Sequence, residues 1–465
     1  MARQQVRSGR PGRPRWRASA ALGVLTLLGA TATTTATTTA VLPAQTAAAA
    51  GPGSAYAFDP AAVRVKGAAT TASAPALSVG TTYRDAIGPG AKLVYRVDLD
   101  ARTSAYVSAV AVPARGSKVA YGDKIEIALQ DANGRECGSN DSEFGVSTDF
   151  ARPLAAYAYR TAGTSGGAGS TCAAAGTYYV VVRRTGDPAS SHDPWDLELR
   201  RAAEPGLAKA GPTQAPEDWP SASPAPPAGD PRPVEGGAGF WDAARLRGSG
   251  AWSTRISPGQ TLFFRVPVDW GQQLFGSVDL ASAPEPPPGA SRSTGGRSLG
   301  LVNGAVAMSL FNPALGFVQS ANAPLYDGRQ KTTSFDPLPP VAYRNRFSYR
   351  SGVRDMRFAG WYYVRVSLNP KLAGVYGKGP YGITLRLTVT GKAASAPAYA
   401  GPPGPFTVVG DHSVAGGNGA AEAGRPGCAG TMRTVGYAGV GTGTVLVLGL
   451  GVWTMAGRRR AVRTG

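Results

Sequence analysis

The sequence contains only two histidines among 465 residues, and this scarcity excludes most classes of hydrolytic enzyme. His192 lies in the segment Ser-Ser-His-Asp-Pro-Trp, and His412 lies in a glycine-rich stretch that cannot hold a side chain rigidly beside a nucleophile. The chain also lacks H-E-x-x-H, G-x-S-x-G and phosphate-binding-loop motifs, and no cysteine and histidine spacing fits a zinc site. We therefore expect a protein that is not an enzyme.

Runs of basic residues interleaved with aromatic residues are missing too, so we expect no nucleic-acid partner. The formal net charge of +19 comes largely from the two ends, where six arginines precede residue 18 and four follow residue 457. Removing these ten arginines from +19 leaves +9 for the part between them. This moderate charge favours contact with anionic cell-wall polymers, lipid headgroups or other envelope proteins.

Cysteine is scarce as well, with three residues in the whole chain. Outside the cell cysteines pair, and Cys137 and Cys172 lie in one predicted domain, so we predict a disulfide between them. Closing that loop contributes about 3 to 4 kcal/mol on the chain-entropy estimate. Cys428 stands alone, and it either pairs with its equivalent in a second chain or stays a free thiol.

The N-terminal end has the composition of an export signal. Six arginines and no acid occupy the first seventeen residues, and an apolar run over 18–30 follows. The run is too short for a bilayer core, which needs about 20 apolar residues, and small residues over 44–50 offer cleavage sites. We predict a removable signal peptide over 1–50 and a secreted chain. The alanine- and arginine-rich composition is typical of an actinobacterium.

The C-terminal end predicts a membrane anchor. The 22 residues of 435–456 include no charged side chain and would span about 33 Å as a helix. Arginines follow at once in the basic tail 457–465, so we expect a single-pass membrane protein with an extracellular body and a cytoplasmic C-terminus. Gly439 and Gly443 form a pair that favours close helix–helix contact in a homodimer, although membrane helices also simply tolerate glycine.

Two blocks of the chain, 81–201 and 239–391, contain short runs of β-branched and aromatic residues that alternate with polar ones. Glycine, proline, asparagine and aspartate separate the runs, which predicts an all-β fold of two tandem antiparallel β-sandwich domains of jelly-roll type. Between and around the blocks we expect a flexible leader over 51–80, a proline-rich linker over 202–238 and a stalk over 392–434.

The two blocks look like copies of one another. Their starts align at a constant spacing of 169 residues, and an Ala-Gly-x-Tyr-Tyr-Val-x-Val strand recurs near their ends, at 175–182 and 359–366. A middle strand followed by an Asx or glycine turn also recurs, at 125–134 and 306–316. The alignment pairs Ile87 with Ile256, Pro89-Gly90 with Pro258-Gly259, Leu93 with Leu262, Tyr95 with Phe264, and Arg96-Val97 with Arg265-Val266.

These motifs resemble those of bacterial pre-peptidase C-terminal (PPC) domains, which are β-sandwich modules of exported proteins. The resemblance covers most of both blocks. The second block departs from it by insertions at 281–300 and 317–355, where we expect features particular to this protein. Some members of the family bind Ca²⁺, so the resemblance implies candidate calcium ligands at Asp131, Asn133 and Glu136, with a hairpin turn capped by Asp131 as the alternative.

Two groups of side chains bear on the choice between binding and catalysis. Carboxylates cluster in the first block, and two of them placed in a cleft would suffice for a glycosidase: Asp123, Glu126, Asp131, Glu136, Asp141 and Glu143. Aromatic rings of the predicted strands suit sugar binding, but we expect most of them in the core: Tyr178, Tyr179, Trp195, Trp361, Tyr362, Tyr363 and Tyr381.

Together these patterns predict a non-catalytic cell-surface protein whose tandem ectodomain acts in binding, adhesion or assembly at the cell envelope. The alternative is a cell-wall-acting hydrolase or protease accessory subunit that uses the carboxylates of the first domain. No cofactor is expected apart from the candidate Ca²⁺.

Overall fold

The computed structural model describes residues 56–162, 172–283, 300–322 and 325–408. Strands account for 42% and helices for 6% of the described residues, which confirms a mostly β protein with two β-sandwiches. Within the described ranges, no helix is both long and apolar enough to cross a membrane. Several predicted features fall outside these ranges: the signal peptide 1–50, Cys428, the membrane helix 435–456 with Gly439 and Gly443, and the tail 457–465.

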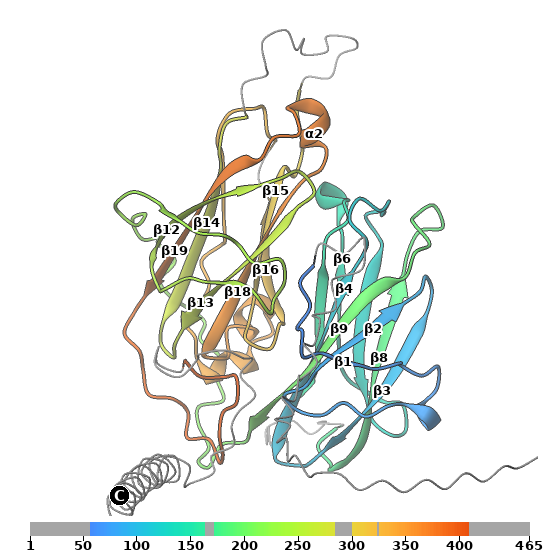
Figure 1. Ribbon diagram of the computed structural model, residues 1–465. Helices are drawn as coiled ribbons and strands as arrows, with labels where there is room; N and C mark the ends of the chain where they lie inside the picture. The colour runs from blue at the N-terminus through green and yellow to red at the C-terminus, as the bar shows by residue number, and fades with distance from the viewer. Residues whose placement is uncertain (1–55, 163–171, 284–299, 323–324, 409–465) are drawn as a thin grey trace, which may run out of the picture. The chain divides into compact units, whose positions relative to one another are not determined.

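The first sandwich consists of two sheets, drawn in blue to green in Figure 1. One sheet has the strand order β1-β2-β9-β4-β7 and the other β3-β8-β5-β6. Apart from the short parallel pair β1 and β2, neighbouring strands are antiparallel. The bounds are β1 Val63–Arg64, β2 Thr82–Ile87, β3 Lys92–Leu99, β4 Thr103–Val112, β5 Lys124–Gln130, β6 Glu136–Glu143, β7 Leu154–Arg160, β8 Gly176–Thr185 and β9 Trp195–Pro205.

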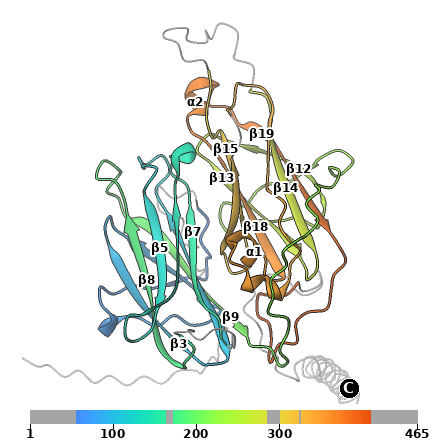
Figure 2. The same cartoon turned by 180° about the vertical axis from the view of Figure 1, so that it is seen from behind.

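The second sandwich also has two sheets, which Figure 2 shows from behind. Their strand orders are β10-β12-β19-β14-β17 and β11-β13-β18-β15-β16. The strand bounds are β10 Arg232–Pro233, β11 Ala244–Arg245, β12 Gly250–Ile256, β13 Thr261–Val268, β14 Gln273–Leu280, β15 Val306–Phe311, β16 Phe317–Asn322, β17 Lys331–Ser334, β18 Gly360–Leu368 and β19 Tyr381–Thr390. The helical turns are η1 Thr71–Ser73, η2 Val146–Thr148, η3 Tyr343–Phe347, α1 Ser351–Arg354 and α2 Leu372–Val375.

The two sandwiches have the same strand order. β10 corresponds to β1, and β12 to β19 correspond in sequence to β2 to β9. Among the described strands, β11 is the one addition in the second sandwich. The spacing of 169 residues holds for β1 and β10 and for both ends of β3 and β13. The predicted Pro-Gly turns join the matching strands, and Gly90 and Gly259 have φ of 67° and 76°, where glycine is favoured. Each copy therefore follows one topology.

Each sandwich buries the alternate residues that the sequence pattern predicts. In β5, Ile125, Ile127 and Leu129 lie in the first core, whereas Lys124 and Glu126 face away from it. The same alternation places one face of β13 and of β19 in the second core. Burial of these side chains is the main source of stability, at about 25 cal/mol per Å² of apolar surface.

Four strands are buried on both faces, because the two sandwiches belong to one compact unit and contact each other through their sheets. These strands are β4 and β7 of the first sandwich and β15 and β18 of the second. We call the side chains between them the stacking layer: Tyr56, Tyr106, Val110, Val112, Ala155, Tyr157, Ala202, Phe240, Ala243, Phe263, Phe311, Ala314, Leu315, Phe358, Tyr363 and Phe406. The sheet with β4 thus packs on the sheet with β18.

The predicted flexible leader requires correction over residues 56–80. This segment adds β1 to the edge of β2 and hydrogen-bonds to β3, with the Ala68 N–H 3.0 Å from the Val94 carbonyl oxygen and the Leu77 N–H 2.8 Å from that of Arg96. Main-chain hydrogen bonds hold it in place, so few large apolar side chains are needed.

The linker and stalk are also partly structured. β9 continues to Pro205, and β10 lies inside the predicted linker 202–238. The two segments pair where the Ala208 N–H meets the Ala398 carbonyl at 2.7 Å, and Phe406 of the predicted stalk is fully buried. The composition of these segments did not predict their ordered structure. Their small residues pack closely against a sheet, although they form no apolar pattern of their own.

Candidate functional site

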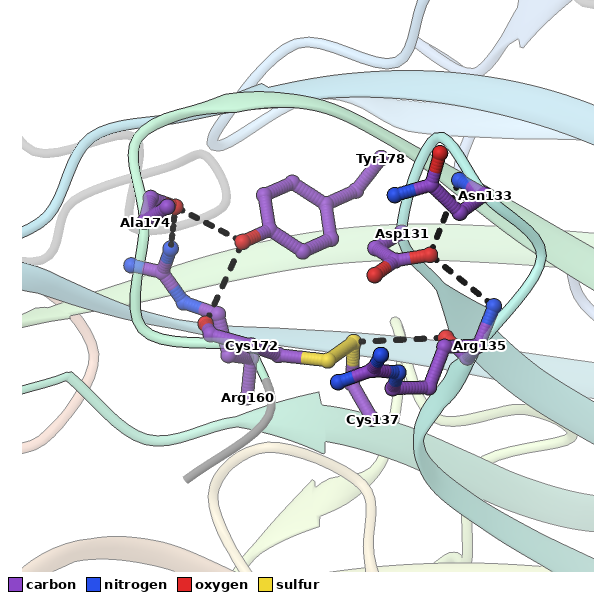
Figure 3. The surroundings of a disulfide bond; sticks show 8 residues. All are labelled: Asp131, Asn133, Arg135, Cys137, Arg160, Cys172, Ala174 and Tyr178. Atoms are coloured by element: carbon purple, nitrogen blue, oxygen red, sulfur yellow. Dashed lines mark hydrogen bonds between the residues drawn. A yellow bond between two sulfur atoms is a disulfide. The ribbon is translucent and has the colours of Figure 1, made fainter. Parts of the chain in front are cut away.

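Asp131, the first candidate calcium ligand, caps the turn between β5 and β6 (Figure 3). Its Oδ1 accepts the backbone N–H groups of Asn133 and Arg135, both at 2.9 Å. Glu136 accepts the Ser139 hydroxyl instead of joining Asp131. Across the described residues, no group of three His, Cys, Asp or Glu side chains is placed to hold a metal ion.

The second sandwich repeats this turn with an amide. Asn312 Oδ1 accepts the N–H groups of Ala314 at 3.0 Å and Gly316 at 2.9 Å, two and four residues further on as in the first copy. Asn312 and Asp131 each also donate their own N–H to the carbonyl four residues ahead. Because the uncharged amide of Asn312 accepts the equivalent hydrogen bonds, turn formation alone accounts for the geometry of Asp131.

Asp131→Asn is therefore expected to leave stability unchanged, whereas Asp131→Ala lowers the free energy of unfolding by about 1 kcal/mol because two backbone donors lose their acceptor. Denaturant unfolding with and without added Ca²⁺ measures both effects. A Ca²⁺-dependent gain in the wild type that disappears in Asp131→Asn would contradict the turn-only role and restore the calcium site.

The predicted disulfide between Cys137 and Cys172 is confirmed, with a Cα–Cα distance of 5.6 Å. It joins the start of β6 to the segment that precedes β8 and lies at the edge of the first core (Figure 3). Close by, the Tyr178 hydroxyl donates to the Ala174 carbonyl at 2.7 Å. The disulfide therefore links the edge strand β6 to the segment that leads into the inner strand β8.

Asp123, Glu126 and Asp141, three of the carboxylates that a hydrolase could use, make separate contacts. Buried Asp123 accepts the N–H groups of Ala120 at 3.0 Å and Asp187 at 2.7 Å, which closes two loops. Glu126 pairs with Arg183 at 3.0 Å on the outer face of β5. Asp141, opposite Glu126 in the β5–β6 register, lies 3.5 Å from the Lys124 ammonium group. Each acid thus has its own hydrogen-bond donor or cation.

The aromatic side chains of the strands lie mostly inside. Five of the seven are buried, and Tyr179 and Trp361 are partly exposed. Tyr363 packs on Phe240 of the stacking layer, with ring centroids 5.4 Å apart. His192 lies exposed in the loop between β8 and β9, and His412 falls outside the described residues.

The largest polar cluster is one that the sequence analysis missed. Glu204, fully buried at the end of β9, accepts hydrogen bonds from the Tyr106 hydroxyl at 2.7 Å and the Tyr399 hydroxyl at 2.8 Å. Arg346 of η3 adds a bidentate ion pair, at 2.7 Å to Oε1 and 3.2 Å to Oε2. Burial by itself lowers the pKa of the Arg346 guanidinium, but the charge and hydrogen bonds of Glu204 together with the nearby Tyr106 and Tyr343 raise this pKa overall.

A second polar cluster crosses the stacking layer beside the first. The Tyr157 hydroxyl of β7 donates to Asp355 and accepts from Arg357 Nη2 at 2.7 Å. Arg357 and Asp355 are 3.7 Å apart, and both are almost fully buried. Nearby, buried Arg365 donates to the Pro153 carbonyl and to Ser309 Oγ at 3.0 Å. Buried charges of this kind fix one relative arrangement of the sheets, because any other leaves them without partners.

Glu198 on β9 is the buried acid whose titration matters most. It is 4% exposed, and its Oε1 accepts the Tyr56 hydroxyl at 3.3 Å. Burial raises the pKa of this carboxyl to about 7, although hydrogen bonds from the Asp59 backbone and Tyr56 and the charge of Arg200 oppose the change. Glu198 therefore titrates near neutral pH at the point where the segment from Tyr56 to Asp59 meets the sheet.

Glu198→Gln is expected to stabilise the protein above pH 7 and to have little effect near pH 4. The folded protein keeps a proton up to about pH 7 that the unfolded chain releases near 4.5, so wild-type stability falls as pH rises through this window. The difference reaches about 3.5 kcal/mol at most, because the pKa of Glu198 rises from 4.5 to about 7 and each pKa unit corresponds to roughly 1.4 kcal/mol. Thermal unfolding of both proteins across pH 4 to 8 tests this, and a difference that stays constant with pH would contradict it.

The fold defines a protein of two stacked β-sandwiches. No protein-family model and no curated protein matches the chain. Among solved structures, the CUB1-EGF-CUB2 domain of human MASP-1/3 is similar at 5% identity and a TM-score of 0.15, over 66% of this chain and 99% of that chain. Tripeptidyl Peptidase 2 is similar at 12% identity and a TM-score of 0.19, over 67% of this chain and 24% of that chain. Scores this low carry no argument about function.

Proposed function

We propose that this chain is a non-catalytic, membrane-tethered surface protein whose two sandwiches form a binding, adhesion or assembly module at the cell envelope. The main support for the proposal is that the acidic side chains form structural ion pairs and hydrogen bonds. Five of the six candidate carboxylates of the first sandwich make separate structural contacts, and the buried acids Glu204 and Asp355 form ion pairs at the stacking layer. Hydrolysis of the glycosidase type needs two carboxyl groups that face one substrate.

Two further observations support the cellular setting and the kind of module. The Cys137–Cys172 disulfide suits an oxidising compartment outside the cell. The shared strand order, with the Ala-Gly-x-Tyr-Tyr-Val motif leading into the central strands β8 and β18, supports assignment of both sandwiches as PPC-like modules. In this proposal the helix 435–456 anchors the protein, and its ligands are wall polymers or other envelope proteins.

The test uses cells that produce the full chain with a C-terminal tag. After alkaline extraction the chain is expected in the membrane pellet, and protease added to whole cells is expected to remove the sandwiches while the tag stays protected. The purified full chain is then incubated with wall polymers and assayed for binding and for hydrolysis. Release by alkali would refute the membrane anchor, and hydrolysis lost on Glu126→Gln would refute the non-catalytic role.

A further inference from the structure

The segment 343–354, which we call the arginine loop, lies in the connection 335–359, which has 25 residues, whereas the matching connection 161–175 of the first copy has 15. The predicted insertion 317–355 requires correction in its first part, because β16 and β17 match β6 and β7 of the first copy. The arginine loop contains η3 and α1 and lies between β17 and β18. Four of its twelve residues are arginines, and no acid occurs in it. The loop therefore adds arginine side chains that the shared β-sandwich fold does not require.

The arginine loop presents cations and an aromatic ring to solvent. Tyr349 is 86% exposed, the highest value among the described large hydrophobic side chains. The guanidinium of neighbouring Arg350 lies 5.7 Å from its ring centroid. Arg344 and Arg350 are exposed, and neither forms an ion pair with any described residue. Arg354 differs from them because it lies close to the Asp355 carboxyl, whose pKa is raised by burial, and the charge of Arg354 opposes this rise.

Buried hydrogen bonds of Asn345 and Arg346 hold the backbone of the arginine loop in place. Asn345 Nδ2 donates to the carbonyls of Pro340 at 2.9 Å and Met356 at 2.8 Å, and Arg346 is fixed by Glu204. The exposed side chains thus project from a backbone that is already ordered, so binding costs little conformational entropy there.

The described chain ends beside this loop. Phe406 stacks on Phe358 with ring centroids 4.3 Å apart, and the ring of Tyr399 lies 6.2 Å from that of Tyr343. The last described residue, Val408, precedes the apolar segment 435–456 by 27 positions, a connection that reaches at most about 90 Å. The route towards the proposed membrane helix therefore leaves the second sandwich on the side that carries the arginine loop.

We propose that Arg344, Tyr349 and Arg350 dock the second sandwich onto anionic lipid headgroups at the outer surface of the cell membrane, an inference that rests on the membrane anchor proposed above. Guanidinium groups form paired hydrogen bonds with phosphate oxygens, and a tyrosine ring is stable at headgroup level. Attraction to an anionic surface is worth about a fivefold change in binding for each arginine. The docked sandwich lies against the bilayer.

The test is hydrogen–deuterium exchange of the full chain in lipid discs. Discs of phosphatidylcholine are compared with discs that also contain phosphatidylglycerol. Peptides covering 343–354 are expected to exchange more slowly in the anionic discs, and high salt is expected to abolish the difference. Arg344→Gln/Arg350→Gln should reduce the docked fraction about 25-fold and remove the protection. Unchanged exchange of β18 reports that this variant is folded.

The matched control is Arg255→Gln/Arg329→Gln, which removes two exposed arginines from other parts of the second sandwich and should keep the protection. Equal loss in this control, or equal exchange of the arginine loop in both discs while the chain stays in them, overturns docking and leaves the anchor intact. A chain that does not enter discs refutes the anchor and docking together. Protection that appears only when anionic wall polymer is added assigns the loop to that polymer and overturns the lipid inference.

Discussion

Replacing Arg346 with alanine is expected to lower the free energy of unfolding by about 3 to 5 kcal/mol, because it leaves the Glu204 side chain buried without its cationic partner. The two side chains are 2% and 0% exposed, so bulk solvent does not screen the charge of Glu204. Tyr106 and Tyr399 still donate to the carboxylate, but neutral donors replace only part of the interaction. Denaturant unfolding monitored by tryptophan fluorescence measures the loss.

The matched control is Lys371→Ala, which breaks an ion pair with Asp149 whose partners are 61% and 36% exposed. An exposed pair contributes at most about 1 kcal/mol, since water and salt screen it. Glu204→Gln/Arg346→Gln completes the comparison by removing both charges, and it should cost less than Arg346→Ala alone. Equal losses in the free energy of unfolding for Arg346→Ala and Lys371→Ala would contradict the prediction, because the buried pair would then stabilise the protein no more than the exposed one.

The first sandwich produced alone, as residues 56–205, is expected to self-associate at concentrations where residues 56–408 remain dispersed. Separation exposes the second faces of β4 and β7, which carry Tyr106, Val110, Val112 and Tyr157. Two tyrosines bury about 150 to 250 Å² each, and with the valines they exceed the few hundred Å² of contiguous apolar surface that soluble monomers expose. Light scattering and size-exclusion chromatography measure the effect.

Polar substitutions on that face provide the control for this experiment. Val110→Thr and Val112→Thr keep the β-branched shape that suits a strand while reducing the apolar surface, so the isolated sandwich should become more dispersed. Val107→Thr, on the opposite face of β4 and inside the first core, should destabilise the sandwich without improving its solubility. A folded, monomeric first sandwich without any substitution would mean that the stacking layer is dispensable.

Much of the fold could be predicted from the sequence because one physical pattern, apolar alternation bounded by turn residues, specifies a strand with one buried face. Ile87 and Ile256, with the Pro-Gly turns that follow them, define the same strand–turn–strand connection in both copies, although its two strands belong to opposite sheets of the sandwich and do not pair as a hairpin. The stacking of the sandwiches could not be predicted in this way. In β4 and β18 both faces are buried, so the sequence does not distinguish the face that packs within a sandwich from the face that packs between them.

The polar clusters were missed for a different reason. Glu204 and Tyr399 fall in stretches whose composition suggested a linker and a stalk, and Arg346 lies more than a hundred residues from the acid that it binds. An ion pair between such distant positions leaves no local pattern in a single sequence. The disulfide was predictable because an oxidising compartment and only two cysteines in one domain restrict the choice.

The contact between the sandwiches joins sheets that are not equivalent in the repeat. The sheet β1-β2-β9-β4-β7 corresponds to β10-β12-β19-β14-β17, yet it packs against the other type of sheet, the one with β13, β15 and β18. A head-to-tail contact of this kind does not close on itself, and in principle it adds further copies without limit. The outermost sheets carry charges instead, such as Arg386 with Asp279 and Arg183 with Glu126. The outer faces of the two described sandwiches therefore differ from the apolar faces that stack, and their charges disfavour the addition of a further copy through the same contact.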